Sequence, residues 1–351
     1  MDTQNQGMFF EDFYIGQQIK HGVPRTITDA DCSMYLALTG SRFALHCAEP
    51  VATRVGFRTT PVDNFLLFNI AFGKTVNDVS RNAVANLGYA EVQFFTTVYP
   101  DDTIYVCSEV IGKKANSNGK TGVVYVHSKA YNQRQQLVLQ FKRWVMINKR
   151  DPFANDSSDS VPDLQSEVEA SSQLIPHCMN LSRWQDYVSD NQLRASQLNV
   201  GDSIFHQDGV TLNDSDHSMA TRLYQNNARV HFDQHLMQSQ KHGKRLVYGG
   251  HVISVCRSLS YNGLANGLYL TAIHSGKHTN PSFAGDTIYA QSNIIAIDQY
   301  SDRDDLSLVK VQLLGFKNNH PTTMSYIQDS DSGRYHQDVI LDMELSYLMP
   351  K

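Results

Sequence analysis

Residues 13–19 read Phe13-Tyr14-Ile15-Gly16-Gln17-Gln18-Ile19, and a matching stretch follows 185 residues later as Leu198-Asn199-Val200-Gly201-Asp202-Ser203-Ile204. The same shift relates His46 to His231. A period this long exceeds that of a solenoid repeat, so the pattern predicts two copies of one domain in a single chain. One of the two copies is then free to lose its active site.

The composition is that of a globular protein with two cores. The chain has 351 residues, of which 41% are hydrophobic and 19% charged, enough for two domains of about 150 residues each. A net charge of -5 provides no broad surface for nucleic acid or an anionic membrane. No apolar run reaches the roughly 18 residues of a membrane helix, and the N-terminal residues lack the pattern of a secretory signal. The five scattered cysteines contain no C-x-x-C pair, which favours reduced thiols in the cytoplasm over a structural zinc site.

The repeats are separated by a polar segment. Residues 151–173 are rich in Ser, Asp and Glu and have few large apolar side chains, so this segment cannot form a core of its own. We interpret it as a linker between an N-terminal repeat, residues 1–150, and a C-terminal repeat, residues 174–351.

The order of predicted elements is similar in the two repeats. Each begins with a short helix, near Thr28 in the first and near Asn213 in the second. Each then has an apolar segment, residues 65–72 or 252–256, which is hydrophobic all round and predicts a buried helix. Strand signals lie at residues 90–94, 103–107, 122–126, 141–147 and 339–345. A buried helix followed by antiparallel strands predicts an α+β fold in which a sheet wraps around the helix.

The sharpest chemical pattern lies in the second repeat. It consists of Gln225-Asn226-Asn227-Ala228-Arg229-Val230-His231-Phe232-Asp233 and the later Leu246-Val247-Tyr248-Gly249-Gly250. This pattern resembles the signature of the MaoC-like, R-specific enoyl-CoA hydratase family, and the resemblance covers nearly the whole chain, twice. It implies a double hot-dog fold, with the two repeats packed as a pseudo-dimer and their sheets continuous. It also implies that His231 is the catalytic histidine and that the Gly249 amide binds the thioester oxygen.

Longer blocks resemble the mesaconyl-CoA hydratases, also called β-methylmalyl-CoA dehydratases, within that family. The blocks are residues 38–45, 72–76, 82–91, 116–126, 222–226 and 246–254. The resemblance implies reversible hydration of mesaconyl-CoA (2-methylfumaryl-CoA) to β-methylmalyl-CoA, without metal or redox cofactor. Coenzyme A enters only as part of the substrate, and a homo-oligomer of the double unit is compatible with this resemblance.

The reaction explains why such residues are needed. Adding water to a double bond conjugated to a thioester requires a base for the water, a proton for the α-carbon and donors for the enolate oxygen. A histidine titrates in a range suited to both proton transfers. A glycine N–H at the start of a buried helix is a preorganised donor, with the helix dipole behind it.

The sequence departs from the family pattern at Asn226, where the family has an aspartate. An asparagine can hold a water molecule but cannot accept its proton. We therefore expect His231 to act as general base and later as general acid, with Asn226 orienting the water. Asp233 or Asp216 could supply the missing carboxylate, and the sequence leaves this open. The competing interpretation of Asp216 is a helix-start carboxylate that the dipole favours.

The first repeat lacks most of the pattern. Opposite His46, the dyad position is Ser41, the second aspartate is replaced by Ala48, and the helix-start glycine is replaced by Asn64. We expect this repeat to be catalytically silent and to shape the acyl pocket.

The remaining candidate residues concern binding. The free carboxylate of the substrate needs a cation, for which Arg42 and Arg229 are candidates. Tyr248 and Gly250 flank the expected oxyanion donor and are assigned to the substrate pocket, although the glycine pair could serve only a tight helix start.

A short basic run precedes the second buried helix. Lys241, Lys244 and Arg245 could grip the phosphates of coenzyme A, or they could belong to a solvated loop.

Two other functions stay open from the sequence. A hot-dog acyl-CoA thioesterase would also bind its ligand at the start of the buried helix. A non-catalytic acyl-CoA-binding protein is the second alternative, and the loss of the carboxylate at Asn226 is the feature that supports it.

Overall fold

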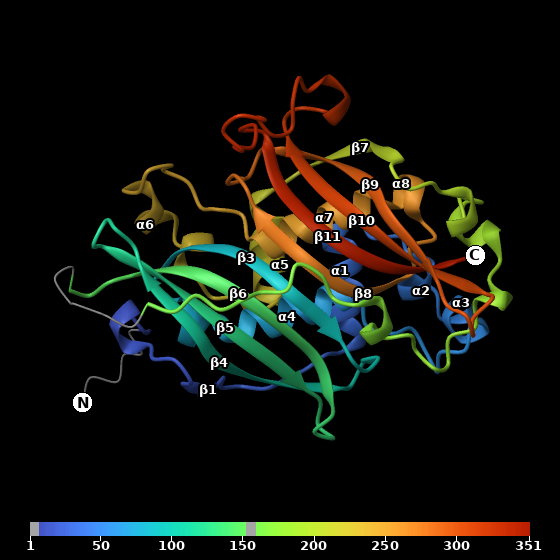
Figure 1. Ribbon diagram of the computed structural model, residues 1–351, viewed down its shortest axis with the longest axis horizontal. Coiled ribbons are helices and arrows are strands. Elements are labelled where there is room, and N and C mark those ends of the chain that lie inside the picture. The colour runs from blue at the N-terminus through green and yellow to red at the C-terminus, as the bar shows by residue number, and fades with distance from the viewer. Residues whose placement is uncertain (1–6, 152–158) are drawn as a thin grey trace.

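The strands form one large antiparallel sheet that spans both repeats. The computed structural model describes residues 7–151 and 159–351, and its 11 strands follow the order β1-β4-β5-β6-β3-β8-β11-β10-β9-β7, with β2 paired to β4 (Figure 1). None of the helices in this described part combines the length and apolar character needed to cross a membrane.

The first repeat contributes six strands and four α-helices. The strands are β1 (Gln18–Lys20), β2 (Arg25–Thr26), β3 (Ala83–Phe94), β4 (Thr103–Ala115), β5 (Thr121–Tyr131) and β6 (Leu137–Asn148). The helices are α1 (Asp29–Thr39), α2 (Ala44–Cys47), α3 (Glu49–Arg54) and α4 (Asn64–Thr75), and a π-helical turn η2 (Val76–Ser80) extends the last of these.

The second repeat follows the same plan. Its strands are β7 (Ser203–Thr211), β8 (Tyr269–His278), β9 (Thr287–Gln299), β10 (Leu306–Lys317) and β11 (Val339–Pro350). Its helices are α5 (Asp214–Leu223), α6 (Gln234–Gln238), α7 (Gly249–Leu259) and α8 (Tyr261–Leu264). Short 3₁₀ turns across the chain are η1 (Phe10–Asp12), η3 (Ala170–Ser172), η4 (Leu181–Arg183), η5 (Asp186–Ser189), η6 (Ala195–Gln197), η7 (Arg229–His231) and η8 (Pro321–Thr323).

The two repeats are joined edge to edge through β3 and β8. Tyr89 of β3 lies opposite Gly276 of β8, and Val92 lies opposite Ile273. The predicted continuous sheet is therefore confirmed. The junction places residues about 185 apart in the chain beside one another, which positions the site described below.

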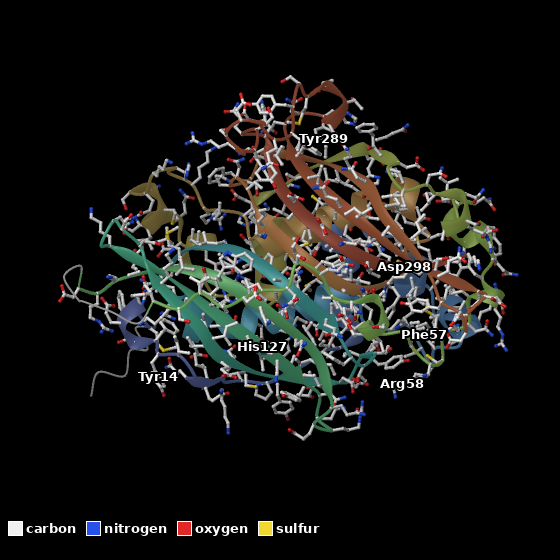
Figure 2. All side chains as sticks on the ribbon, viewed as in Figure 1. Tyr14, Phe57, Arg58, His127, Tyr289 and Asp298 are labelled. Carbon is white, nitrogen blue, oxygen red and sulfur yellow. The ribbon has the colours of Figure 1, made fainter. Side chains whose placement is uncertain are left out.

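The predicted buried helices are α4 and α7. Every residue of α4 is buried, as the apolar run at residues 65–72 predicts, and one cluster of hydrophobic side chains spans both helices and both repeats. Figure 2 shows the side chains on the ribbon, with Tyr289 and Asp298 labelled near the two ends of β9. The helices meet where the Asn69 amide nitrogen lies 3.1 Å from the Ser254 hydroxyl. These two residues are equivalent in the repeats, being 185 apart, so this contact lies beside the pseudo-two-fold axis.

The predicted helix starts near Thr28 and Asn213 are confirmed. Helix α1 begins directly after Thr28, whose hydroxyl accepts a hydrogen bond from the Asp31 N–H at 3.2 Å. Helix α5 begins directly after Asn213, but there the Asn213 amide donates to Asp216 rather than capping the helix.

The described part of the predicted linker lies along the sheet, on the face away from α4 and α7 (Figure 1). Ser160 exchanges two backbone hydrogen bonds with Lys113 of β4. Farther along, the Val168 N–H donates to Nδ1 of His274 in β8 at 3.0 Å. Residues 152–158 of that linker lie outside the described residues. The polar segment therefore bridges the outer faces of both repeats.

Candidate active site

A cavity of about 690 Å³ lies between the two repeats. The first repeat lines it with residues of α4, η2, β3 and β6, and the second repeat with residues of η7, α6, the start of α7 and the end of β8. His231, Asn226 and Gly249, predicted from the sequence to work together, all line this cavity. The fold therefore brings the three predicted catalytic residues to one cavity.

His231 is a buried, neutral histidine. It ends the turn η7 and exposes 6% of its surface, and its Nδ1 lies 2.8 Å from the Leu246 carbonyl oxygen. A carbonyl only accepts hydrogen bonds, so Nδ1 carries the proton and Nε2 keeps its lone pair. Burial lowers the pKa of His231 to about 4, against a smaller opposing effect of the Leu246 hydrogen bond. The ring therefore offers a free basic nitrogen at neutral pH.

Asn226 is held by its own turn. Its Oδ1 accepts the Ala228 N–H at 3.0 Å, and only 3% of the residue is exposed. Burial raises the pKa of the neighbouring Tyr248 hydroxyl, and a side-chain hydrogen bond with Asn226 opposes this shift. With Oδ1 engaged, the amide nitrogen is the donor that Asn226 can offer to a water molecule.

Gly249 is the first residue of α7. Within residues 7–151 and 159–351, its N–H meets no hydrogen-bond acceptor, as expected for the first turn of a helix. A Cβ at this position would overlap the ring of His278. Only glycine therefore lets the helix start approach that ring, and its amide is available to an oxygen in the cavity.

Two residues of the cavity were not predicted. The Tyr89 hydroxyl lies 3.0 Å from Nε2 of His278, and burial lowers the pKa of that histidine to about 4. Tyr89 comes from β3 of the first repeat and His278 from β8 of the second. Their contact depends on the pairing of strands from different repeats, which no local pattern reveals.

A third unpredicted residue is Arg143 of β6, which lines the cavity and is fully buried. It donates to the Thr75 hydroxyl at 2.8 Å, and its guanidinium carbon lies 4.4 Å from the centre of the Phe72 ring. The alternation of inward residues along β6 carries a signal for it, because Arg143 stands between the buried Phe141 and Val145.

The two candidate carboxylates are not brought into the cavity. Asp233 is exposed and caps α6 by accepting the Leu236 N–H at 2.9 Å. Asp216 lies at the start of α5 and accepts hydrogen bonds from Asn213 and Ser215, of which the first is the main cause of its lowered pKa. Among the described residues, no aspartate or glutamate lines the cavity. The described residues therefore supply no carboxylate near Asn226 that could replace the aspartate of the family pattern.

Of the other four residues predicted to bind the substrate, two line the cavity and two do not. Tyr248 lines the cavity with its ring 5.5 Å from that of His231, and Arg229 lines it as an exposed residue. Gly250 is buried behind Tyr248 and does not line the cavity. Arg42 lies elsewhere, exposed, with its guanidinium 4.4 Å from the centre of the Tyr261 ring.

The predicted phosphate-binding cluster lies outside the cavity lining. Lys241 and Lys244 are exposed, and Arg245 pairs with Asp214 at 2.7 Å. Gln240, the residue before the cluster, does line the cavity.

The equivalent place in the first repeat keeps the histidine but not its surroundings. Nδ1 of His46 lies 3.0 Å from the Pro61 carbonyl oxygen, which matches the contact of the second repeat at equivalent positions. Asn64, however, begins α4 where Gly249 begins α7, and its amide donates to the Leu270 carbonyl at 2.7 Å. A side chain thus occupies the helix start in this repeat.

The chain is similar to known proteins along nearly its whole length. The family model of mesaconyl-CoA hydratase matches residues 1–328. The chain is 47% identical to a β-methylmalyl-CoA dehydratase of Chloroflexus aurantiacus, over 99% of this chain and 98% of that one. It is 41% identical to a mesaconyl-CoA hydratase of Cereibacter sphaeroides, over 99% of each.

Solved structures show the same fold. A putative MaoC domain protein dehydratase from Chloroflexus aurantiacus is similar with a TM-score of 0.97 and 46% identity, over 100% of this chain and 99% of that one. A Mycobacterium tuberculosis protein with a double hotdog fold is similar with a TM-score of 0.77 and 22% identity, over 99% and 100%. The predicted double hot-dog fold is confirmed.

Proposed function

The chain belongs to the mesaconyl-CoA hydratase family, and from that premise we propose that it is a hydro-lyase for the reversible hydration of mesaconyl-CoA to β-methylmalyl-CoA. One observation carries the chemistry. A buried, neutral His231, whose Nε2 keeps its lone pair, shares a cavity with the Gly249 N–H at the start of α7. A base and an electrophilic donor are the two groups that conjugate addition of water requires.

The Gly249 amide binds the thioester oxygen. As water adds to the β-carbon, the electrons of the double bond move onto this oxygen and form an enolate. The N–H is fixed in place, the α7 dipole stands behind it, and the surroundings are largely buried. One such donor typically stabilises the transition state by about 2.7–4 kcal/mol.

His231 moves the proton. Nε2 removes a proton from the attacking water, and the new C–O bond forms at the β-carbon. The ring then carries protons on both nitrogens, and the adjacent enolate stabilises this imidazolium by its opposite charge. Nε2 returns the proton to the α-carbon, which yields the hydroxyacyl thioester and restores the neutral ring. Dehydration follows the same steps in reverse.

Asn226 orients the water. Its amide donates to the water oxygen, and because an amide cannot take a proton, removal of the proton is left to His231. The turn that engages Oδ1 with the Ala228 N–H fixes the direction of this donor.

The first repeat encloses the acyl group. Phe72 and Tyr89 contribute walls of the cavity, whereas the start of α4 is occupied by the side chain of Asn64. We propose that this repeat performs no chemistry of its own.

The test is a two-channel assay of the purified protein with mesaconyl-CoA. We expect the absorbance of the enoyl thioester to fall while no free thiol appears. Thiol released in step with the absorbance change would identify a thioesterase. Binding of mesaconyl-CoA with turnover no faster than in His231→Ala would identify an acyl-CoA-binding protein instead.

Three further properties belong to this proposal. The reaction uses coenzyme A only as part of the substrate and needs no metal or redox cofactor. The protein acts in the cytoplasm, which its five free cysteines favour. The double unit assembles into a homo-oligomer, which size-exclusion chromatography with light scattering tests.

A further inference from the structure

Arg143 is a buried cation without a counter-ion. No carboxylate of the described residues pairs with it. Its contacts are neutral: the Thr75 hydroxyl, the Asn86 side chain at 3.4 Å and the face of the Phe72 ring. Its Nε has no hydrogen-bond partner among residues 7–151 and 159–351.

A buried cation without an opposite charge lowers the stability of the folded protein. Removing a cation from water without an opposite charge carries a large desolvation cost, and buried guanidinium groups are normally paired. Burial lowers the pKa of Arg143 to about 10, with Tyr89 and Tyr248 opposing the shift, so the group is still charged at neutral pH. The protein therefore keeps a positive charge inside its cavity for which its own described residues supply no anion.

The location of Arg143 matches the inner part of the cavity. Val84 and Leu236, which expose 52% and 37% of their surface, mark the open side, whereas Arg143 and Tyr89 are almost fully buried. Arg229, which also lines the cavity, is exposed. Arg81, a third arginine of the lining, is half-buried, so among the described arginines of the lining only Arg143 is fully buried.

Aromatic rings connect Arg143 to the catalytic histidine. The Tyr248 ring lies 5.5 Å from the ring of His231 and 5.9 Å from the ring of Phe72, over which the guanidinium is placed. In mesaconyl-CoA, the free carboxylate is bonded to the carbon that takes up water. A cation that binds it must therefore lie in the same cavity as the base, beyond the thioester.

We propose that Arg143 binds the free carboxylate of a short dicarboxylic acyl-CoA, so that the first repeat selects the substrate on which the second repeat acts. This inference rests on the proposed function. Nη2 donates to Thr75 and Nη1 to Asn86, which fixes the guanidinium, and the unpartnered Nε with the remaining N–H groups can donate to both carboxylate oxygens. The sequence-based candidates Arg42 and Arg229 lie outside the cavity and at an exposed position, respectively.

The test compares two saturated thioesters that differ only in a terminal carboxylate, succinyl-CoA and butyryl-CoA. Their dissociation constants are measured by titration calorimetry, without any need for turnover. We expect wild type to bind succinyl-CoA at least about tenfold more tightly, the scale of a buried hydrogen bond to a charged group. R143M should lose this preference while its affinity for butyryl-CoA stays within about threefold of wild type. R229M is the matched control and should keep the preference.

Several outcomes would overturn the inference. Wild type could bind the two thioesters with equal dissociation constants. R143M could still bind succinyl-CoA more tightly than butyryl-CoA, or it could lose affinity for both thioesters to the same extent. R143Q, a neutral but polar replacement, replaces R143M if circular dichroism shows that R143M is unfolded. A protein that shows the preference but no hydration would overturn the proposed function and leave this inference standing.

Discussion

The Nδ1 atom of His231 lies 2.8 Å from the carbonyl oxygen of Leu246, and this contact decides which nitrogen of the ring is basic. The first repeat keeps the same contact between His46 and the carbonyl oxygen of Pro61, at 3.0 Å. The orientation of the histidine is therefore common to both repeats. What separates the repeats is the start of the buried helix, open at Gly249 and filled by a side chain in the first repeat.

Gly249→Ala should damage both catalysis and packing. The new methyl group would overlap the His278 ring, which the Tyr89 hydroxyl holds in place, so either the ring or the amide must move. We expect kcat to fall about 100- to 1000-fold, as for loss of an oxyanion donor, together with a lower melting temperature.

Gly22→Ala is the control for Gly249→Ala. An added Cβ at Gly22 meets no atom within 4 Å, so this variant should keep wild-type kcat and melting temperature. If Gly249→Ala also kept wild-type kcat, the oxyanion role of that amide would be ruled out.

Asn226→Asp should move the pH dependence of hydration. Burial keeps the pKa of His231 at about 4, so wild-type kcat/KM should show no acid limb from this group at any pH at which the protein is still folded. A carboxylate in the same cavity favours the imidazolium and raises the pKa of His231. In Asn226→Asp, the fall of kcat/KM on the acid side should therefore begin at a higher pH than in wild type.

Asn226→Ala separates this electrostatic effect from water orientation. It should lower kcat about 10- to 100-fold at every pH, because the water is no longer positioned, without shifting the profile. An unchanged profile in Asn226→Asp would show that this position does not influence the base.

Protein stability should fall as the pH drops from about 6.5 towards 4. Burial lowers the pKa of five histidines to about 4 from an ordinary value of 6.5, namely His206, His231, His251, His274 and His278. The unfolded chain binds protons in this range and the folded chain does not, so stability is complete above pH 6.5 and is lost below it. Protonation of each of these histidines in the unfolded chain lowers the free energy of unfolding by up to about 3 kcal/mol.

Thermal melting at pH 7.5, 6 and 5 measures this loss. His274→Gln is the matched variant, since its amide can still accept the Val168 N–H and donate to the Ser346 hydroxyl but cannot be protonated in this range. It should show a shallower decline than wild type. A melting temperature that is constant between pH 7.5 and 5 would contradict the neutral state of these rings.

Chelation should leave the activity intact, because His231, Asn226 and the Gly249 N–H carry every step of the proposed reaction. Dialysis against EDTA, followed by the absorbance assay, should give wild-type kcat. A loss that Mg²⁺ or Zn²⁺ restores would show that a metal takes part.

Much of the fold could be predicted from the sequence, because the features that determine it lie in short stretches of the chain. The apolar run at residues 65–72 has no polar face, so the helix it forms can only be buried, and Thr28 predicts a helix start by its capping hydroxyl. The repeat itself predicts a pseudo-dimer. The structure confirms each of these features.

The site could be predicted only where its residues lie close in the chain. His231, Asn226 and Gly249 belong to one motif, and all three line the cavity. Arg143 and His278 are brought there by strands of different repeats, and no short pattern encodes that pairing.

Asp233 shows the converse problem. It stands within the motif, but its side chain caps the short helix α6 and therefore faces away from the chemistry. Spacing alone cannot tell a helix cap from a catalytic carboxylate, since both are acidic groups beside a turn.

The central claim is that one histidine, His231, performs the proton transfers. The most direct test is the steady-state rate of mesaconyl-CoA hydration by His231→Ala beside His46→Ala, which removes the equivalent ring of the first repeat. We predict that kcat falls about 100- to 10,000-fold in His231→Ala and stays within about threefold of wild type in His46→Ala. Near wild-type turnover by His231→Ala, or a comparable loss in His46→Ala, would contradict the account.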